Sequence, residues 1–246
     1  MLKKSILINW VVLCFSASFS VSTAAEVFWQ DFSVSYLNGG DYKVDHKDQQ
    51  ILTFEHVAGT SWGDSFMFLD HLRGDDGSRS NYAEWSPRIS LCKVAEYCVS
   101  NGLIKDVLVS TTVEMSSGAT NFLYGVGLDL NVPQFQFLQL NFLRRQNDSV
   151  KNNWQLTTAW ALPFKMAEQD FTYDGFIDWF NSTDDQSSSM NFTSQLKWSM
   201  GKALGLSNKL YLGVEYVYWL NKYGIEDSPE FETDESNLNL IVKWHF

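Results

Sequence analysis

The carboxyl-terminal stretch SNLNLIVKWHF, residues 236–246, decides the fold that this sequence predicts. From residue 238 on, apolar residues occupy its even positions, and polar residues occupy most of its odd positions. A period of two is typical of a β-strand whose two faces meet different surroundings. The apolar row consists of Leu238, Leu240, Val242, Trp244 and Phe246. One face of this strand therefore contacts an apolar phase, which is lipid in a membrane barrel or a core in a soluble sheet.

The same alternation recurs throughout the chain and predicts twelve strands. No helical periodicity competes with it over any of these segments. An even number of up-and-down strands returns both ends of the chain to one side of the barrel, the periplasmic side in an outer membrane. The predicted strands lie near residues 32–38, 50–56, 62–70, 82–91, 107–115, 121–131, 135–145, 153–164, 171–180, 190–200, 209–222 and 236–246.

The polar faces of these strands favour a transmembrane barrel over a soluble β-sandwich or lectin. A closed barrel pairs its backbone groups without water, as hydrocarbon demands, and its wet lumen accepts the polar side chains. Short connections at 57–61 and 131–133 are expected on the periplasmic side, and longer charged ones at 71–81, 181–189 and 223–235 outside. We therefore predict an all-β fold, a twelve-stranded antiparallel transmembrane β-barrel with the character of an outer-membrane porin-like channel.

The amino terminus predicts a secretory signal peptide over residues 1–25. Lys3 and Lys4 precede an apolar run at 6–15, and small residues follow up to Ala25. The alternative is a transmembrane anchor, but the apolar run of about ten residues is short of the ~20 that a helical span needs. Residues 26–246 are then expected to form a single barrel domain in the outer membrane of a Gram-negative cell.

Charge excludes one class of partner. Removal of the two lysines leaves 16 basic and 29 acidic residues, so the net charge falls from −11 to −13. Nucleic-acid binding needs basic patches, so we expect no nucleic-acid partner. The mean hydropathy of −0.19 is compatible with a barrel, because alternating strands average to a value near that of soluble proteins.

Two cysteines, Cys92 and Cys98, remain after cleavage, within the segment 92–106 that is long for a periplasmic turn. An even count in an oxidising compartment predicts one small-loop disulfide, with two free thiols as the alternative. No His or Cys partners complete a metal site at this spacing, so we expect neither a metal nor another cofactor.

An outer-membrane enzyme, such as a lipase or protease barrel, is disfavoured. The chain has four histidines, and none lies in a recognisable nucleophile motif. They are His46, His56, His71 and His245.

The stretch WGDSFMFLD, residues 62–70, carries two acids and three aromatic residues on one parity: Trp62, Asp64, Phe66, Phe68 and Asp70. A charge on the lipid face of a barrel costs about 1–4 kcal/mol, depending on depth. We therefore assign this set to the lumen, with Met67 and Leu69 outward. The alternative places both acids in the headgroup zones and turns the Phe rings to lipid.

Neighbouring strands add further polar side chains to the lumen. Acids and aromatic rings together suit a nucleoside, because rings stack on a base for roughly 1–3 kcal/mol and carboxylates accept hydrogen bonds from ribose hydroxyls. The alternative is a salt-bridged lumen that only holds the barrel in shape. The candidate substrate-binding residues are Trp62, Asp64, Phe66, Phe68, Asp70, Glu84, Arg88, Asp174, Asp178 and Lys197.

Four stretches of the sequence resemble the Tsx family of nucleoside-specific outer-membrane channels, and within it the OmpK branch. They are WGDSFMFLD at 62–70, EWSPRIS at 84–90, GVGLD at 125–129 and DFSVSYLNGGDYKVD at 31–45. The chain's last residue, Phe246, also resembles the recognition signal of outer-membrane barrels. The family's lumen acids and aromatics would map onto Trp62, Asp64, Phe66, Phe68, Asp70, Glu84 and Arg88.

The resemblance implies a monomeric barrel, surrounded by outer-membrane lipid and lipopolysaccharide, through which nucleosides diffuse passively into the periplasm. It also implies outer loops that phages or colicins exploit as receptors. The alternative function is a non-selective or structural outer-membrane surface protein without nucleoside selectivity.

Overall fold

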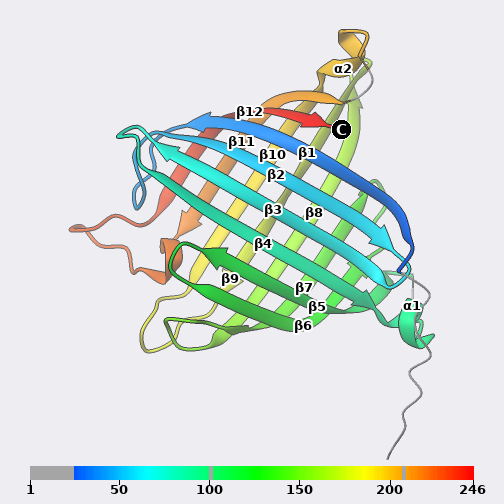
Figure 1. The fold of residues 1–246 in the computed structure, drawn as a ribbon, viewed down its shortest axis with the longest axis horizontal. Helices are drawn as coiled ribbons and strands as arrows, with labels where there is room; N and C mark the ends of the chain where they lie inside the picture. The colour runs from blue at the N-terminus through cyan, green and yellow to red at the C-terminus, as the bar shows by residue number, and fades with distance from the viewer. Residues whose placement is uncertain (1–24, 100–101, 207–208) are drawn as a thin grey trace, which may run out of the picture.

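The computed structural model describes residues 25–99, 102–206 and 209–246, and it folds them into one closed antiparallel β-barrel (Figure 1). Each strand pairs with its neighbours in the chain, and the last strand pairs with the first to close the ring. The strands are β1 (Val27–Gly39), β2 (Gln49–Thr60), β3 (Gly63–Gly74), β4 (Arg79–Ser90), β5 (Ile104–Ser116), β6 (Thr120–Leu130), β7 (Phe137–Gln146), β8 (Asn153–Met166), β9 (Gln169–Phe180), β10 (Ser189–Ser199), β11 (Leu210–Leu220) and β12 (Glu235–His245).

The described residues contain all twelve predicted strands, and the alternation along β12 shows why they form. Leu238 and Leu240 are 60% and 65% exposed on the outer face, whereas Asn237 and Asn239 beside them are 1% exposed. A barrel in lipid turns apolar side chains outward and polar ones inward, which reverses the arrangement of a soluble protein. The barrel wall therefore has an apolar exterior and a polar interior.

One outward aromatic residue is buried against the wall itself. Trp160 of β8 is 8% exposed, because its ring lies over Gly175 of β9, where an added Cβ would come within 3.0 Å of the ring. Tyr173 and Phe192 flank this ring, with centroids 6.1 Å and 5.9 Å away. Gly175 thus provides the space that the Trp160 ring occupies on the outer surface.

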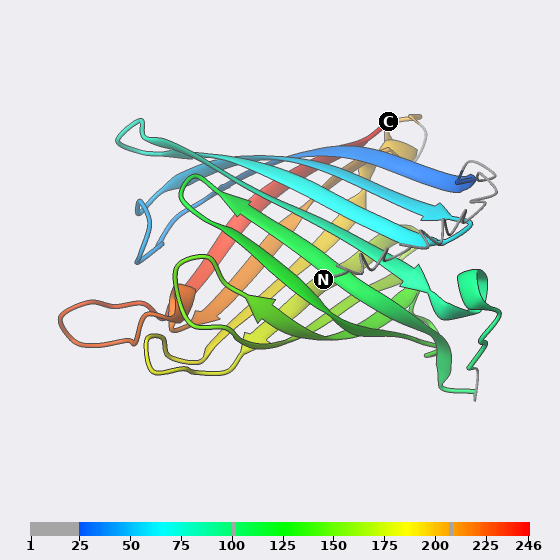
Figure 2. The ribbon, with the colours of Figure 1, turned by 60° about the horizontal axis from the view of Figure 1, so that its bottom comes forward.

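The two ends of the barrel differ. β1 begins and β12 finishes at one end, which we call the terminal end, and the opposite end is the distal end (Figure 2). Turns at 61–62 and 167–168 are short and lie at the terminal end, whereas loops at 181–188 and 221–234 lie at the distal end. Long distal loops and short terminal turns are the arrangement of bacterial outer-membrane barrels, in which the termini lie in the periplasm.

Two predicted connections are shorter than the sequence indicated. The predicted outer loop 71–81 narrows to 75–78, because β3 and β4 remain in register up to the pair Arg73 and Arg79. The predicted turn 57–61 narrows to 61–62, because β2 runs to Thr60. The strands extend beyond the alternating apolar segments from which they were predicted, because hydrogen bonding between strands does not require apolar side chains.

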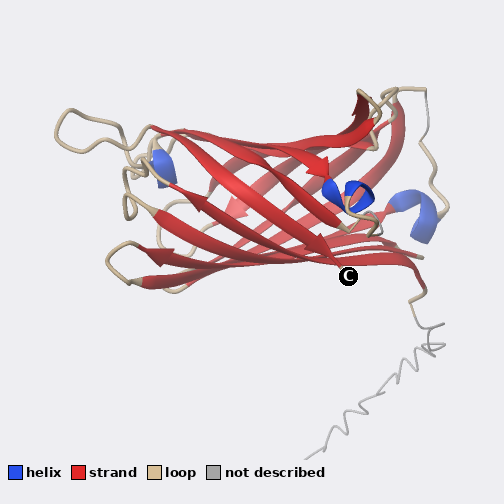
Figure 3. Ribbon diagram, turned by 90° about the horizontal axis from the view of Figure 1, so that it is seen from above, coloured by secondary structure: helices blue, strands red, loops and turns tan. Residues whose placement is uncertain are grey.

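The described part of the chain has three short helical segments, which lie at the ends of the barrel, outside its wall of strands (Figure 3). They are α1 (Leu91–Ala95), α2 (Met200–Ala203) and η1 (Lys222–Gly224). None of the helices in the described part of the chain is long and apolar enough to cross a membrane. The predicted signal peptide falls almost entirely on residues 1–24, outside the described residues, and stays a prediction.

The long terminal connection between β4 and β5 is built around α1. The structure joins Cys92 and Cys98 by a disulfide bond. Lys93 reaches back to the β2–β3 turn, where its ammonium donates to the carbonyl oxygens of Thr60 at 2.9 Å and Gly63 at 3.2 Å. The disulfide is the one that the sequence predicted, whereas the contacts of Lys93 were not apparent from the sequence.

Candidate functional site

The side chains on the polar face of each strand point into the lumen, and those of β3 include the set of acids and aromatic residues. Arg88 of β4 donates two hydrogen bonds to Asp64, at 2.8 and 2.6 Å, and a third to Asp129 of β6 at 2.9 Å. The side chain of Arg88 is 5% exposed. Asp64 therefore points inward, and every second residue of β3 after it, Phe66, Phe68 and Asp70, shares that direction.

A second ionic cluster occupies the wall formed by β9, β10, β11, β12, β1 and β2. The ammonium of Lys197 lies 2.6 Å from Asp174 of β9 and 2.8 Å from the side-chain oxygen of Gln195. Lys243 of β12 pairs with Glu55 of β2, across the seam at which the ring closes. Two of the predicted lumen residues, Asp174 and Lys197, are thus each other's partners, as in the alternative of a salt-bridged lumen.

A third cluster lies toward the distal end. Arg145 of β7 pairs with Glu114 of β5 through two hydrogen bonds of 2.7 Å, and its guanidinium carbon lies 5.3 Å from the ring centroid of Phe180. Asp178 of β9, another predicted lumen residue, accepts hydrogen bonds from Thr157 and, at 3.1 Å, from Gln155. Arg144, which precedes Arg145 in the sequence, points outward and lies over Trp154 with 5.2 Å to the ring centroid.

Aromatic rings form a row on the lumen side of β3 and β4. The centroids of Phe66 and Phe68 are 5.9 Å apart, and those of Phe68 and Tyr82 are also 5.9 Å apart. The Tyr82 hydroxyl donates to Glu84 at 2.6 Å, and Thr53 donates to one oxygen of Asp70 at 2.6 Å. We call Phe66, Phe68 and Tyr82 the aromatic row; carboxylates lie at its side.

The structure also adds residues that the sequence prediction left out of the candidate set. Glu55, Glu114, Glu215 and Arg145 all point into the lumen and are bonded there. Their position in the predicted strands could have identified them, because each alternates with the apolar residues of its strand and therefore lies on the opposite, inward face. Trp62 is the exception among the predicted residues, since it lies in the turn before β3 and not in the strand.

The distal mouth is narrowed by the loop 40–48, which joins β1 to β2. Tyr42 from this loop is buried, and its hydroxyl donates to Asn239 of β12 at 2.9 Å. The ammonium of Lys222 lies 2.6 Å from Asp45 and 2.8 Å from Glu235. Burial raises the pKa of the Tyr42 phenol above its ordinary value, and Asn239 opposes this shift. The loop 40–48 is therefore anchored to the loop 221–234 by buried bonds.

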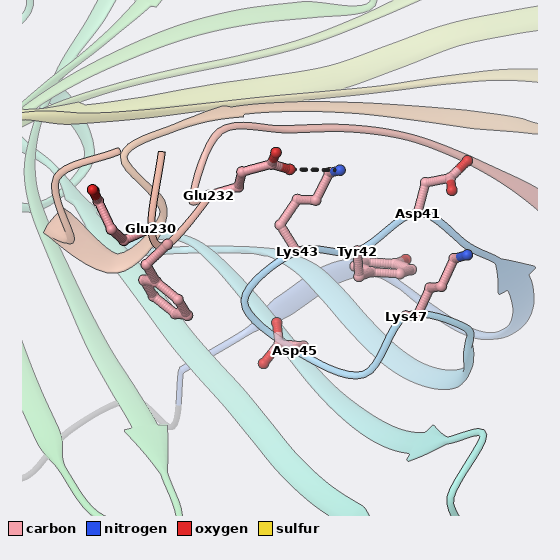
Figure 4. Close-up of a pocket in the computed structure, with 8 residues that line it drawn as sticks. Asp41, Tyr42, Lys43, Asp45, Lys47, Glu230 and Glu232 are labelled. Carbon is pink, nitrogen blue, oxygen red and sulfur yellow. Dashed lines mark ion pairs between the residues drawn. The ribbon is translucent and has the colours of Figure 1, made fainter. Parts of the chain in front are cut away.

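A surface cavity of about 330 Å³ lies between these same two loops (Figure 4). Lys43 reaches from one loop to Glu232 of the other, with 2.8 Å between the ammonium and the carboxylate. Asp41, Lys47 and Phe231 also line the cavity. Its walls are mostly charged and solvent-exposed, so it forms part of the outer vestibule and lies outside the lumen.

One group among the described residues could hold a metal ion. The ligand atoms of His46, Asp75 and Asp76 lie within 4.8 Å of one another at the distal mouth. All three side chains are exposed. They offer three ligands without a buried second shell to orient them, and such exposed groups are common without an ion.

Comparison with known proteins places the chain in a family. Residues 24–246 match the family model described as "Nucleoside-specific channel-forming protein, Tsx". The chain is also 29% identical over 265 residues to outer membrane protein OmpK of Vibrio parahaemolyticus, covering 93% of this chain and 97% of that protein.

Solved structures share the fold at low sequence identity. The KdgM porin has a TM-score of 0.53 at 11% identity, covering 87% of this chain and 99% of its own. The NanC porin has a TM-score of 0.54 at 10% identity, covering 88% and 99%. At these identities the likeness concerns the barrel alone, and it confirms the predicted fold class.

Proposed function

This chain belongs to the Tsx family of nucleoside-specific channel-forming proteins, and we propose that its barrel lets nucleosides diffuse passively across the outer membrane into the periplasm. The coarser statement follows from the family itself: the chain is a channel-forming protein of the outer membrane, not an enzyme. The prediction of the family from four short stretches is confirmed by a match over residues 24–246.

The aromatic row is the observation that carries the nucleoside proposal. Its three rings follow one another at 5.9 Å along the lumen wall, so a planar base that leaves one ring meets the next. Stacking on an aromatic ring is worth roughly 1–3 kcal/mol per base and does not depend strongly on the identity of the base. A series of weak, similar sites favours passage over retention.

Carboxylates beside the row supply the second half of nucleoside recognition. Asp70 accepts a hydrogen bond from Thr53 through one oxygen, and its other oxygen has no partner among the described residues. Glu84 accepts the Tyr82 hydroxyl at 2.6 Å. A carboxylate with an available oxygen accepts a hydrogen bond from a ribose hydroxyl, which a lumen lined only with apolar groups could not do.

The opposite wall of the lumen offers a similar combination. β9 lies six strands from β3 in either direction around the ring, so the two strands face each other across the lumen. Phe176 of β9 shares the inward parity of Asp174 and Asp178. A nucleoside in the lumen therefore passes between aromatic and acidic groups on both sides.

Liposome swelling tests this function. Liposomes containing the wild-type protein are placed in isosmotic adenosine, thymidine or a sugar of matched size, and both nucleosides should enter faster than the sugar. Phe68→Ala should lower the nucleoside rates by several-fold, as expected for the loss of roughly 1–3 kcal/mol of stacking, and leave the sugar rate unchanged or higher. Phe122→Ala is the matched control, because Phe122 lies on the outer face and is 50% exposed to lipid.

Equal rates for all three solutes would reject nucleoside selectivity and favour a non-selective pore. The absence of conductance steps in planar-bilayer recordings would instead favour a structural surface protein. The use of the outer loops by phages or colicins, and the monomeric state, stay predictions; phage adsorption and light scattering of the purified protein in detergent would test them.

A further inference from the structure

The outer surface of the β3–β4 hairpin ends in a pair of arginines at the distal end. Arg73 of β3 and Arg79 of β4 are direct partners in the strand register. Both share the outward parity of Met67 and Leu69, opposite to that of the lumen-facing Asp70. Both side chains are exposed. Two arginine side chains therefore extend outward from directly opposite positions on the two strands.

Strand geometry holds these two side chains close together. The backbone N–H of Gly74 donates to the carbonyl oxygen of Ser78 at 3.1 Å, so the adjacent pair, Arg73 and Arg79, is of the non-hydrogen-bonded type. Cross-strand side chains approach each other most closely in such pairs. The next non-hydrogen-bonded pair, two residues away on each strand, is His71 and Asn81, whose side chains are joined by a hydrogen bond of 2.8 Å.

The repulsion between the two guanidiniums is not offset by an ion pair within the described residues. Neither Arg73 nor Arg79 forms an ion pair with a carboxylate in the parts of the chain that the structure describes. Like charges directly opposite each other on two strands are destabilising. This arrangement differs from that of Arg88 and Arg145, each of which is matched by acids in the lumen. An anion from outside the chain would therefore stabilise the pair by offsetting this repulsion.

The position of the arginine pair along the barrel axis indicates which anion is within reach. Gly63, the first residue of β3, and Arg73 are ten residues apart, which corresponds to about 33 Å along a strand. With a strand tilt of about 40°, this is about 25 Å along the barrel axis, the usual height of the lipid-facing apolar band. Between these levels the outward residues of β4 are Ile89, Pro87, Trp85, Ala83 and Asn81, so the apolar row ends just below the arginine pair. The arginine pair thus lies where the apolar band meets the headgroups of the outer leaflet.

We infer that Arg73 and Arg79 form a binding site for the phosphate group of a lipid in the outer leaflet of the outer membrane. Each guanidinium presents a planar fork of donors that matches phosphate oxygens in pairs, and a phosphate between the two forks replaces their mutual repulsion with attraction. The lipid's acyl chains then lie against the apolar surface below, where Leu69 and Trp85 are 40% and 47% exposed.

The test measures lipid binding by the full chain, purified in detergent, with native mass spectrometry or thermophoresis. The probe is bisphosphorylated lipid A, compared with the same glycolipid lacking phosphate and with inorganic phosphate. The wild-type protein should bind the bisphosphorylated form at least tenfold more tightly than the phosphate-free form. The double variant Arg73→Gln with Arg79→Gln should lose about tenfold or more of that affinity, since hydrogen bonds to charged groups contribute on this scale.

A charge-matched control separates a specific site from general attraction. The double variant Lys105→Gln with Lys165→Gln removes the same two positive charges at the terminal end, from exposed side chains, and should bind the lipid as the wild type does. The heat-dependent shift of the folded barrel on a gel shows that both double variants are folded. Unchanged lipid A affinity in the arginine variant, or an equal loss in the lysine variant, would overturn the assignment. Displacement of lipid A by an equal concentration of inorganic phosphate would overturn the lipid as the occupant.

Discussion

Arg88 and Asp64 are joined across the β3–β4 pair by two parallel hydrogen bonds, from Nε at 2.8 Å and from a terminal nitrogen at 2.6 Å. The same guanidinium reaches Asp129 of β6, two strands beyond β4, at 2.9 Å. One buried cation thus ties β3, β4 and β6 together from the inside. Its removal would leave two carboxylates in the lumen without a partner.

Arg88→Met should therefore destabilise the barrel. Breaking a buried ion pair by removing one partner costs about 3–5 kcal/mol, and we expect about 3 kcal/mol because both carboxylates keep some contact with lumen water. Urea unfolding in micelles, followed by tryptophan fluorescence, measures the loss. Arg144→Met is the control: this outward guanidinium lies over the ring of Trp154 and forms no ion pair within the described residues, so its loss should cost about 1 kcal/mol or less. Equal losses in the two variants would contradict this account.

Lys222→Met should release the loop 40–48 from the distal mouth. The ammonium binds Asp45 and Glu235, and it lies 4.9 Å from the ring centroid of Trp219. Without it, the buried Glu235 loses its cation, and trypsin should cut after Lys43 or Lys47 about tenfold faster, because the loop opens more often. Lys151→Met removes an exposed ion pair with Asp184 and should leave the cleavage rate unchanged. Equal cleavage in wild type and Lys222→Met would show that other contacts hold the loop.

The loop 221–234 should lose part of its order in acid through Asp227. The backbone N–H groups of Thr233 and Asp234 donate to this carboxylate and hold its pKa below the ordinary value. A group whose pKa is lower in the folded state stabilises the fold above its unfolded pKa of about 3.9, and this contribution disappears as the pH falls through the folded value. The NMR shift of the Thr233 amide should therefore titrate with a midpoint below about pH 3.9. In Asp227→Asn the same shift should stay flat, and an unchanged titration would assign it to another acid.

The Cys92–Cys98 disulfide should order its own segment without supporting the barrel. Both cysteines lie outside the strands, and the bond closes a loop with a sequence separation of 6. Cys92→Ser with Cys98→Ser should speed hydrogen exchange in residues 91–99 and leave the heat-dependent gel shift of the barrel unchanged. Peptide mapping of the wild type without reductant should recover the two cysteines linked. Alkylation of both thiols without reductant would refute the bond.

Asp70→Asn should distinguish recognition of the ribose from recognition of the base. If the Asp70 oxygen that does not bond Thr53 accepts a ribose hydroxyl, the variant should slow the entry of adenosine in liposome swelling by several-fold. Entry of the 2′,3′-dideoxy analogue, which lacks both hydroxyls, should be slower than that of adenosine in wild type and unaffected by the variant. A similar effect on both solutes would indicate that Asp70 acts on the shape of the pore.

The facing of β3 illustrates how far sequence reasoning reaches. The cost of placing Asp64 and Asp70 in lipid was enough to predict that Phe66 and Phe68 face the lumen, and the ion pair of Asp64 with Arg88 agrees with that direction. The same reasoning could not identify the partners. Arg88 and Asp129 are 41 residues apart, and Lys243 and Glu55 are 188 residues apart, so their meeting depends on the register and on ring closure.

The sequence by itself determined the twelve strands and, where the alternation is regular, which face meets lipid. Lipid favours an apolar side chain at each outward position independently of the other strands. This preference is therefore visible in the local sequence as alternation, most clearly from Leu238 to Phe246. Only the tertiary structure decided which lumen charges neutralise each other, how the loop 40–48 closes over the mouth, and that Arg73 meets Arg79. These contacts join positions on different strands, and a shift of the register by one residue would exchange the two faces and separate the pairs.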